Sequence, residues 1–333
     1  DTRFASGVYL PILEEDSDVL ANDQVIRASE SHKGNLIGLW EHFDTTNYRI
    51  YARSYDGSDT TWAAIGGDGL AYTNTTISVG LDILEAESAL LALLIHTDDH
   101  IVVRSTDGGT NWIAPSTQLT AALLSDNVTA NENIDGGLLA FIGGEAVAVV
   151  WHESNGTVTF FRGTGGGDNW FDEAIDISSG NGPQGVAVMA GIDNEDKLYV
   201  CLREGLYEID TAPSTWTTRL IFRMTPNNFN GKRMEIGHDG ALWFSQGVDN
   251  DTPPISYRMT VANGERRIER VPNDFGVGDG APAEMAGSIK QWVSAEGMMY
   301  AFQGGGKAGR NARILCHNGD GWHSMRRNGT ENH

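Results

Sequence analysis

The sequence predicts an all-β protein, and three observations lead to this class. Runs of four to eight apolar, β-branched and aromatic residues recur along the 333 residues, separated by turns rich in Gly and Asp. Helical periodicity is nearly absent. A tryptophan closes such a turn at intervals of about 50 residues at Trp62, Trp112, Trp170 and Trp216, and again after about twice that interval at Trp322. Repeats of this length, each able to form a four-stranded antiparallel sheet, predict a β-propeller.

The strands are expected in chain order from their apolar runs. Two extended candidates, Val8 to Leu13 and Gln24 to Ala28, either complete the first blade or close the ring with strands from the C-terminal end. Asp82 to Leu94 is the one stretch that a helix could also claim, although its tail equally fits a buried strand. Further strands are expected at 90–95, 101–105, 137–142, 146–151, 158–162, 185–191, 197–203, 206–209, 287–294, 298–303 and 313–317.

The repeats predict a single propeller domain over residues 1–333. Six blades are expected, with seven as the alternative, because the interval between Trp216 and Trp322 has room for two units. Residues 1–33 would supply the ring-closing or first-blade strands. The blades are placed near residues 34–62, 63–112, 113–170, 171–222, 223–271 and 272–325.

Charge narrows the classes of partner. The chain carries 45 acidic and 23 basic residues, a net charge of -22, so a nucleic-acid partner is not expected. Asp outnumbers Glu, and only 5 of the basic residues are Lys, which is typical of salt-adapted, halophilic proteins. An ordinary acidic secreted protein is the alternative. The longest apolar stretch, Ala89 to Ile95, is too short to cross a bilayer, so no membrane insertion is expected.

One turn carries a recognisable motif. Ser105, Asp107, Gly109 and Trp112 fit the pattern Ser-x-Asp-x-Gly-x-x-Trp directly after an expected strand. The segment resembles the Asp-box, or BNR repeat, of sialidase-like propellers. The resemblance implies a tight turn between outer strands, in which the Ser and Asp side chains accept backbone hydrogen bonds and the Trp packs inside. A second copy, with Ser54, Asp56 and Trp62, carries one extra residue, and a third, at 163–170, lacks both the Ser and the Asp.

A second resemblance covers residues 184–330. Segments such as Gly240 to Trp243 and Gly319 to His323 are similar in style to propeller domains in virion tail and fibre proteins. Together with the salt-adapted composition, this similarity implies a structural or adhesive protein of a tailed virus.

No catalytic residue is assigned from the sequence. The resemblance implies that an enzyme would need three arginines to bind a carboxylate, a Tyr nucleophile activated by Glu, and a separate acid. Arg27, Arg104 and Arg203 could converge from innermost strands. Tyr207 and Glu208 are adjacent on a strand, so their side chains face opposite ways and cannot form the nucleophile pair.

Binding residues are proposed from exposed aromatics and paired cations. Trp40 and Phe171 could stack on sugar rings. The Arg pairs could meet an acidic partner or neutralise neighbouring carboxylates, and they are Arg266, Arg267, Arg326 and Arg327. No cofactor is expected. Calcium or another metal would have to use residues that equally suit solvated turns: His96, Asp98, His100, Asp249 and Asp251.

The expected function is that of a non-catalytic module outside the cell or on a virion surface. Its propeller loops would bind a cell-surface glycan, a protein receptor or other subunits of a larger assembly in host recognition. The alternative is an exo-acting glycoside hydrolase or a polysaccharide lyase with its site at the mouth of the central channel. A cluster of arginines with a tyrosine and a carboxylate would favour the enzyme.

Overall fold

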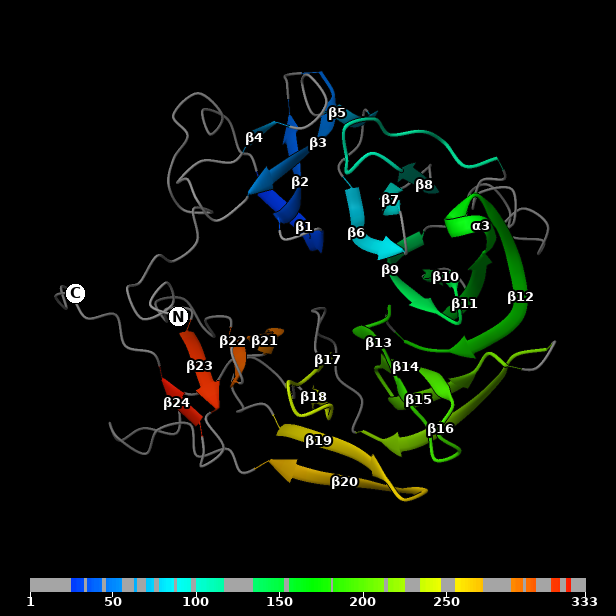
Figure 1. The fold of residues 1–333 in the computed structure, drawn as a ribbon, viewed down its shortest axis with the longest axis vertical. Coiled ribbons are helices and arrows are strands. Elements are labelled where there is room, and N and C mark those ends of the chain that lie inside the picture. Colours follow the sequence, from blue (N-terminus) through cyan, green and yellow to red (C-terminus); the bar gives the residue numbers. More distant parts are fainter. Residues whose placement is uncertain are drawn as a thin grey trace, which may run out of the picture. The chain divides into compact units, whose positions relative to one another are not determined.

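The structure is a computed structural model in which the chain divides into two compact units, Asp1–Ile177 and Ser178–His333. It is all-β, and antiparallel sheets make up nearly all of its regular structure (Figure 1). The residues described are 25–32, 35–43, 46–55, 63–64, 70–74, 78–86, 89–96, 100–116, 134–152, 156–180, 182–212, 215–224, 234–246, 255–271, 289–295, 298–303, 313–317 and 322–324.

The described part of the first unit holds three sheets. Sheet 1 consists of β1 (Val25–His32), β2 (Asn35–Phe43), β3 (Tyr48–Tyr55), β4 (Ala63–Ala64) and β5 (Leu70–Asn74). Sheet 2 consists of β6 (Ser78–Ala86), β7 (Ala89–His96) and β8 (His100–Ser105). Sheet 3 consists of β9 (Ile134–Ile142), β10 (Glu145–His152), β11 (Thr157–Gly163) and β12 (Asn169–Ser178), with the single turn α3 (Thr164–Gly167) between its last two strands.

The described part of the second unit holds three four-stranded sheets. Sheet 4 consists of β13 (Gly185–Ala190), β14 (Asp196–Leu202), β15 (Gly205–Asp210) and β16 (Thr217–Arg223). Sheet 5 consists of β17 (Met234–Ile236), β18 (Leu242–Gln246), β19 (Ile255–Ala262) and β20 (Glu265–Val271). Sheet 6 consists of β21 (Ile289–Ala295), β22 (Met298–Gln303), β23 (Arg313–His317) and β24 (Trp322–Ser324).

The strands follow the apolar runs of the sequence closely. The segment from Gln24 to Ala28 falls largely within β1, so it begins sheet 1, whereas residues 8–13 lie outside the described part. The stretch from Asp82 to Leu94 forms parts of β6 and β7 and no helix. No helix in the described ranges is long and apolar enough to span a membrane.

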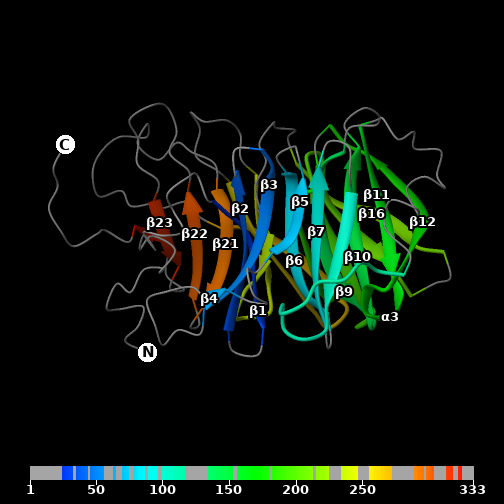
Figure 2. The same cartoon turned by 90° about the horizontal axis from the view of Figure 1, so that it is seen from above.

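The core lies between neighbouring sheets. In the first unit, β7 is covered on both faces: Leu91 and Leu93 pack toward sheet 3, and Leu90, Ala92 and Leu94 pack toward sheet 1. Both faces of β7 are therefore apolar, which explains its continuous hydrophobic run. In Figure 2, β6, β7, β9 and β10 run alongside one another. In the second unit, sheets 4 and 5 share a core, and its aromatic residues include Tyr199 and Phe244.

Hydrogen bonds from backbone N–H groups to side chains hold the turn that follows β8. Gly109 donates its backbone N–H to Oγ of buried Ser105 at 2.8 Å, and Asn111 donates its own to Oδ1 of Asp107 at 2.8 Å. The Asn111 N–H is the main reason that the pKa of Asp107 lies below its ordinary value. Gly108 and Gly109 have φ of 75° and 91°, values that favour glycine.

Loss of the buried hydroxyl should destabilise this turn. We expect Ser105→Ala to lower the free energy of unfolding by about 1–3 kcal/mol, because the Gly109 N–H then stays buried without its acceptor. Thr110→Ala removes an exposed hydroxyl of the same turn and should cost less than about 0.5 kcal/mol. Urea denaturation of both variants tests this, and equal stabilities would contradict it.

Candidate functional site

Three polar side chains lie in one row across sheet 4. The two-residue turn between β14 and β15 pairs Leu202 with Gly205, and the same register places Tyr199 opposite Glu208. Glu208 in turn lies opposite Arg219 on β16. Residues directly opposite each other on antiparallel strands share one face of the sheet, so the phenol, carboxylate and guanidinium meet on the face that packs toward sheet 5.

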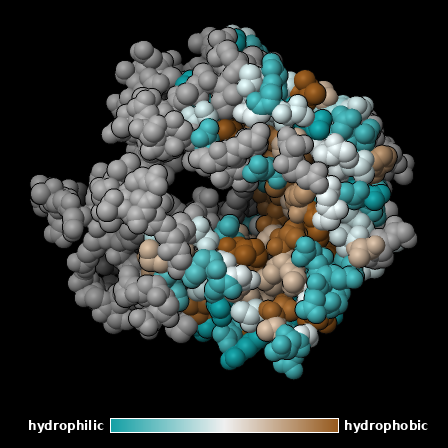
Figure 3. All heavy atoms as spheres, in the orientation of Figure 1, coloured by the Kyte–Doolittle hydropathy of each residue, from teal (hydrophilic) through white to brown (hydrophobic). Residues whose placement is uncertain are grey.

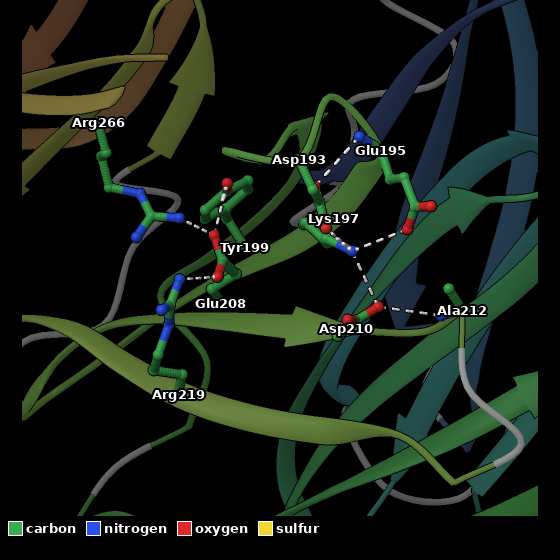
Figure 4. A network of polar contacts seen from close by, with 9 residues as sticks. All are labelled: Asp193, Glu195, Lys197, Tyr199, Glu208, Asp210, Ala212, Arg219 and Arg266. Carbon is green, nitrogen blue, oxygen red and sulfur yellow. Dashed lines mark hydrogen bonds and ion pairs between the residues drawn. The ribbon is translucent and has the colours of Figure 1, made fainter. Parts of the chain in front are cut away.

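Glu208 is the centre of this cluster (Figure 4). Tyr199 donates its hydroxyl hydrogen to Oε2 of Glu208 at 2.9 Å, and Nη2 of Arg219 contacts Oε1 at 2.5 Å. Arg266, which comes from β20 of sheet 5, also donates to Oε2. Its guanidinium carbon lies 6.0 Å from the centre of the Tyr199 ring. Two cations and a phenol therefore surround one carboxylate, and we call these four residues the Glu208 cluster.

The cluster has a buried end and an open end. Tyr199 is fully buried and Glu208 nearly so, whereas the Arg219 side chain is 55% exposed. Burial raises the pKa of the Tyr199 phenol above its ordinary value, and the charges of Arg266 and Arg219 offset this only in part. Tyr199 therefore stays protonated at neutral pH. The arrangement can bind an anion at Arg219 and can move a proton between Tyr199 and Glu208.

A second polar group lies on the same sheet around Lys197. The ammonium of Lys197, whose side chain is only 4% exposed, contacts Asp193 at 2.8 Å, Asp210 at 3.0 Å and Glu195 at 3.3 Å. Figure 4 shows the three carboxylates converging on it. Burial by itself lowers the pKa of Lys197, but the hydrogen bonds to the three carboxylates outweigh it and raise the pKa above its ordinary value.

Removal of this ammonium should change stability in a pH-dependent way. The hydrogen bond from Lys197 is the main reason that the pKa of Asp193 lies below 3.8, so its stabilising effect is present above that pH and is lost as the pH falls further. The raised pKa of Lys197 keeps its own contribution complete below its ordinary pKa of 10.5. We expect Lys197→Met to lower the melting temperature near pH 7 and to differ less from the wild type near pH 3.

A pH series of melting temperatures, recorded for both proteins, measures this effect. Glu265→Gln on β20 is a suitable control, because Glu265 is exposed and has no ion pair within the described ranges. A difference between Lys197→Met and the wild type that is the same at pH 3 and pH 7 would contradict the prediction.

The first unit holds an Arg between two carboxylates on sheet 3. Nε of Arg162 contacts Glu173 at 2.6 Å, and its Nη1 lies 3.7 Å from Glu145. Burial raises the pKa of Glu173, whereas the charge of Arg162 lowers it. The pair to Glu173 joins neighbouring strands within the sheet and compensates the charge of the nearly buried Glu173 carboxylate.

The three arginines that could have converged lie on different elements of the fold. Arg104 lies on β8, and its Nε donates to the Gly166 carbonyl at 3.0 Å. Arg203 lies in the turn between β14 and β15 in the other unit, not on a first strand. Arg27 lies on β1, and its side chain is not among those described. The residues that meet instead are Tyr199 and Arg219, which the sequence reasoning did not select.

The remaining binding and metal candidates from the sequence lie on different elements, and some lie outside the described ranges. Phe171 on β12 is 47% exposed. Arg266 belongs to the Glu208 cluster, and Arg267 contacts Glu269 at 2.5 Å on the surface. The side chains of Trp40, His96 and His100 are not described, and several candidates lie outside the described ranges: Asp56, Trp62, Asp98, Asp249, Asp251, Arg326 and Arg327. Within the described ranges, no group of three or more His, Cys, Asp and Glu residues could hold a metal ion.

Comparison with known proteins connects the chain to propeller folds. No protein-family model and no curated protein matches it. A "putative 6-phosphogluconolactonase" from Bacteroides uniformis has a TM-score of 0.53 at 10% identity, over 90% of this chain and 83% of its own. The polysaccharide lyase Uly1 has a TM-score of 0.49 at 9% identity, over 90% and 80%. A GH32 β-fructofuranosidase from Bombyx mori has a TM-score of 0.42 at 13% identity, over 89% and 74%.

Structural similarity at such low sequence identity shows the fold alone. The similar structures have propeller folds. The expectation of a non-catalytic, virion-borne adhesion module is nevertheless wrong, because the similar structure with a TM-score of 0.53 carries the name of an enzyme and not that of a virion or adhesion protein. The sequence reasoning failed here because it gave the greatest weight to composition and segment style, neither of which identifies a site.

Proposed function

We propose that the chain is a glycan-active enzyme of the lyase type, which acts on a sugar that bears a carboxylate. The observation that carries this proposal is the Tyr199 and Glu208 pair between two arginines. A lyase of this kind needs a cation to bind the sugar carboxylate, a base to remove the neighbouring proton and an acid to protonate the leaving oxygen. The Glu208 cluster offers one group for each role.

Arg219 is the group that a substrate meets first, because its side chain is half-exposed. A sugar carboxylate that replaces Glu208 at Arg219 leaves Oε1 of Glu208 free as the base. Glu208 takes the proton from the carbon beside the sugar carboxylate, the glycosidic C–O bond breaks, and Tyr199 donates its proton to the leaving oxygen. The hydrogen bond between Tyr199 and Glu208 then returns the proton to the phenol and restores the starting state.

The raised pKa of Tyr199 argues against a tyrosine nucleophile. A hydrolase in which tyrosine is the nucleophile needs the phenolate, and burial of Tyr199 opposes that form. A protonated phenol suits the role of acid. The Glu208 cluster spans β14, β15, β16 and β20. The proposed reaction therefore takes place away from β13 and β17, the first strands of sheets 4 and 5.

The test is a substrate screen with two readouts. Polygalacturonate, alginate, hyaluronan and chondroitin sulfate are incubated with the protein, and the ultraviolet absorbance of an unsaturated uronate product is followed. An aryl sialoside tests hydrolysis in parallel. We expect unsaturated product from at least one polysaccharide, and a loss of about a hundredfold or more in kcat for Tyr199→Phe. We expect Arg219→Met to act chiefly on KM.

Arg270→Met is the matched control, because Arg270 is an exposed arginine on β20 outside the cluster. Its activity should equal that of the wild type. Circular dichroism and melting temperatures establish that each variant is folded. Absence of product from all four polysaccharides, cleavage of the sialoside alone, or full activity of Tyr199→Phe would overturn the proposal.

We also infer that the sheets close into one sialidase-like propeller of six blades, with seven as the alternative. In support, β1, β6 and β9 are neighbours in the first unit, and β13, β17 and β21 are neighbours in the second, as first strands around a channel are. One closed ring should unfold in a single transition whose calorimetric and van't Hoff enthalpies agree. Two separate transitions would contradict closure.

A further inference from the structure

Two sulfur atoms lie in direct contact on sheet 6. Cys316 on β23 and Met298 on β22 come from neighbouring strands (Figure 1), and the Cys316 thiol donates to Sδ of Met298 at 3.4 Å. The ladder pairs Cys316 with Tyr300, two residues after Met298, so both sulfur-bearing side chains share one face of the sheet. We call Cys316 and Met298 the sulfur pair.

The sulfur pair borders solvent. Cys316 and Met298 are each half-buried, so part of both side chains is exposed. Cys316 is a free thiol, and the other free cysteine, Cys201, is fully buried in sheet 4. A small ion in solution can therefore reach Cys316 but not Cys201.

The thiol proton occupies a position that a metal ion can take. Burial raises the pKa of the Cys316 thiol, and a hydrogen bond with Tyr300 offsets this only in part, so the thiol is protonated at neutral pH. The thiol hydrogen therefore points toward Sδ of Met298. Metal–sulfur bonds are about 2.3 Å long, so two sulfurs 3.4 Å apart can both contact one ion.

We propose that the sulfur pair binds one copper(I) ion. A thiolate and a thioether are soft ligands, which select copper(I) over magnesium, calcium and manganese, the ions that prefer oxygen ligands. On binding, the Cys316 thiol releases its proton to water, and its thiolate and the Met298 thioether each give an electron pair to the ion. The oxidation state of copper does not change.

Two further features support this choice of ion. The Met side chain has three rotatable bonds, so it can adjust the distance between the two sulfurs at little cost. On the other side of β23, the ladder pairs Cys316 with His323 of β24, a residue type that also binds copper. Because one donor of the pair is a methionine, the site differs from the oxygen-rich clusters that hold calcium.

The inference goes beyond the proposed function, because the sulfur pair lies on sheet 6 and the Glu208 cluster on sheets 4 and 5. The substrate screen uses protein free of copper, and the copper measurement uses no polysaccharide. An inactive protein that binds copper(I) would overturn the lyase proposal alone. An active enzyme that does not bind copper(I) would overturn this inference alone.

The experiment is a competition for copper(I) on the full chain, without oxygen and with ascorbate as reductant. Bicinchoninate, a chelator that is coloured when it binds copper(I), reports how much of the ion the protein takes. We expect one ion per chain, with affinity lowered about a hundredfold in Cys316→Ser and about tenfold in Met298→Leu. Cys201→Ala and Met189→Leu, the latter at a half-buried methionine on β13, are the matched controls and should bind as the wild type does.

X-ray absorption at the copper edge identifies the ligands directly. We expect two sulfur neighbours in the wild type and one in Met298→Leu, a substitution that conserves volume and should stay folded. Melting temperatures establish that each variant is folded. Three results would each overturn the inference: the wild type retains no copper against the chelator, a folded Met298→Leu variant binds with unchanged affinity, or Cys201→Ala loses as much affinity as Cys316→Ser.

Discussion

Glu208→Gln should lower the free energy of unfolding by about 3 kcal/mol, because removal of one member of a buried ion pair leaves the other charge without compensation. Arg266, whose side chain is only 14% exposed, loses its carboxylate, and the buried Tyr199 hydroxyl loses a charged acceptor. The amide nitrogen of Gln also brings donors to a position where three donors already converge. The expected loss of stability therefore depends on how deeply these groups are buried and not on how many contacts Glu208 makes.

A surface pair provides the control for this prediction. Arg267 and Glu269 form an ion pair in which the arginine side chain is 78% exposed, and Glu269→Gln should cost less than about 1 kcal/mol. Urea denaturation followed by tryptophan fluorescence measures both variants. The double variant Glu208→Leu with Arg266→Met removes both charges and should recover part of the loss. A cost for Glu208→Gln no greater than that for Glu269→Gln would contradict the prediction.

The sequence predicts the strands well because their signal is local. Apolar runs bounded by Gly and Asp turns mark strands directly, as in β10 and β22. Asp82 to Leu94 was ambiguous for a physical reason: a strand covered on both faces has no polar alternation, so its periodicity does not distinguish it from a helix. Which sheet covers which face depends on residues far apart along the chain.

Only part of the candidate site could be predicted from the sequence. Tyr207 and Glu208 were rejected as a pair because neighbours on a strand face opposite ways, and the structure agrees with that argument. The cross-strand partner of Glu208 could have been predicted from the turn between β14 and β15. The two turn residues, Arg203 and Glu204, fix a register that places Tyr199 opposite Glu208. The contact of Arg266 with Glu208 could not have been predicted, because Arg266 comes from another sheet, 58 residues further along the chain.

Gly205, which begins β15, should be among the least tolerant positions of the second unit. A Cβ there would lie 2.1 Å from the carbonyl oxygen of Phe222 and 2.7 Å from Leu220. The carbonyl cannot move aside easily, because Gly205 and Arg223 are paired in the ladder between β15 and β16. We expect Gly205→Ala to lower the free energy of unfolding by about 3 kcal/mol, the upper part of the usual range for overpacking.

Gly240→Ala is the control for this steric clash, because it tests the cost of the backbone conformation alone. Gly240 has φ of 72°, but a Cβ there meets nothing within 4 Å, so the substitution should cost only the roughly 1–2 kcal/mol of a left-handed backbone. Chemical denaturation of both variants compares the two costs. If Gly205→Ala were no more destabilising than Gly240→Ala, the close approach of the β16 backbone to Gly205 would not exist in solution. The turn that orients Arg203 and Glu204 would then be looser than the structure shows.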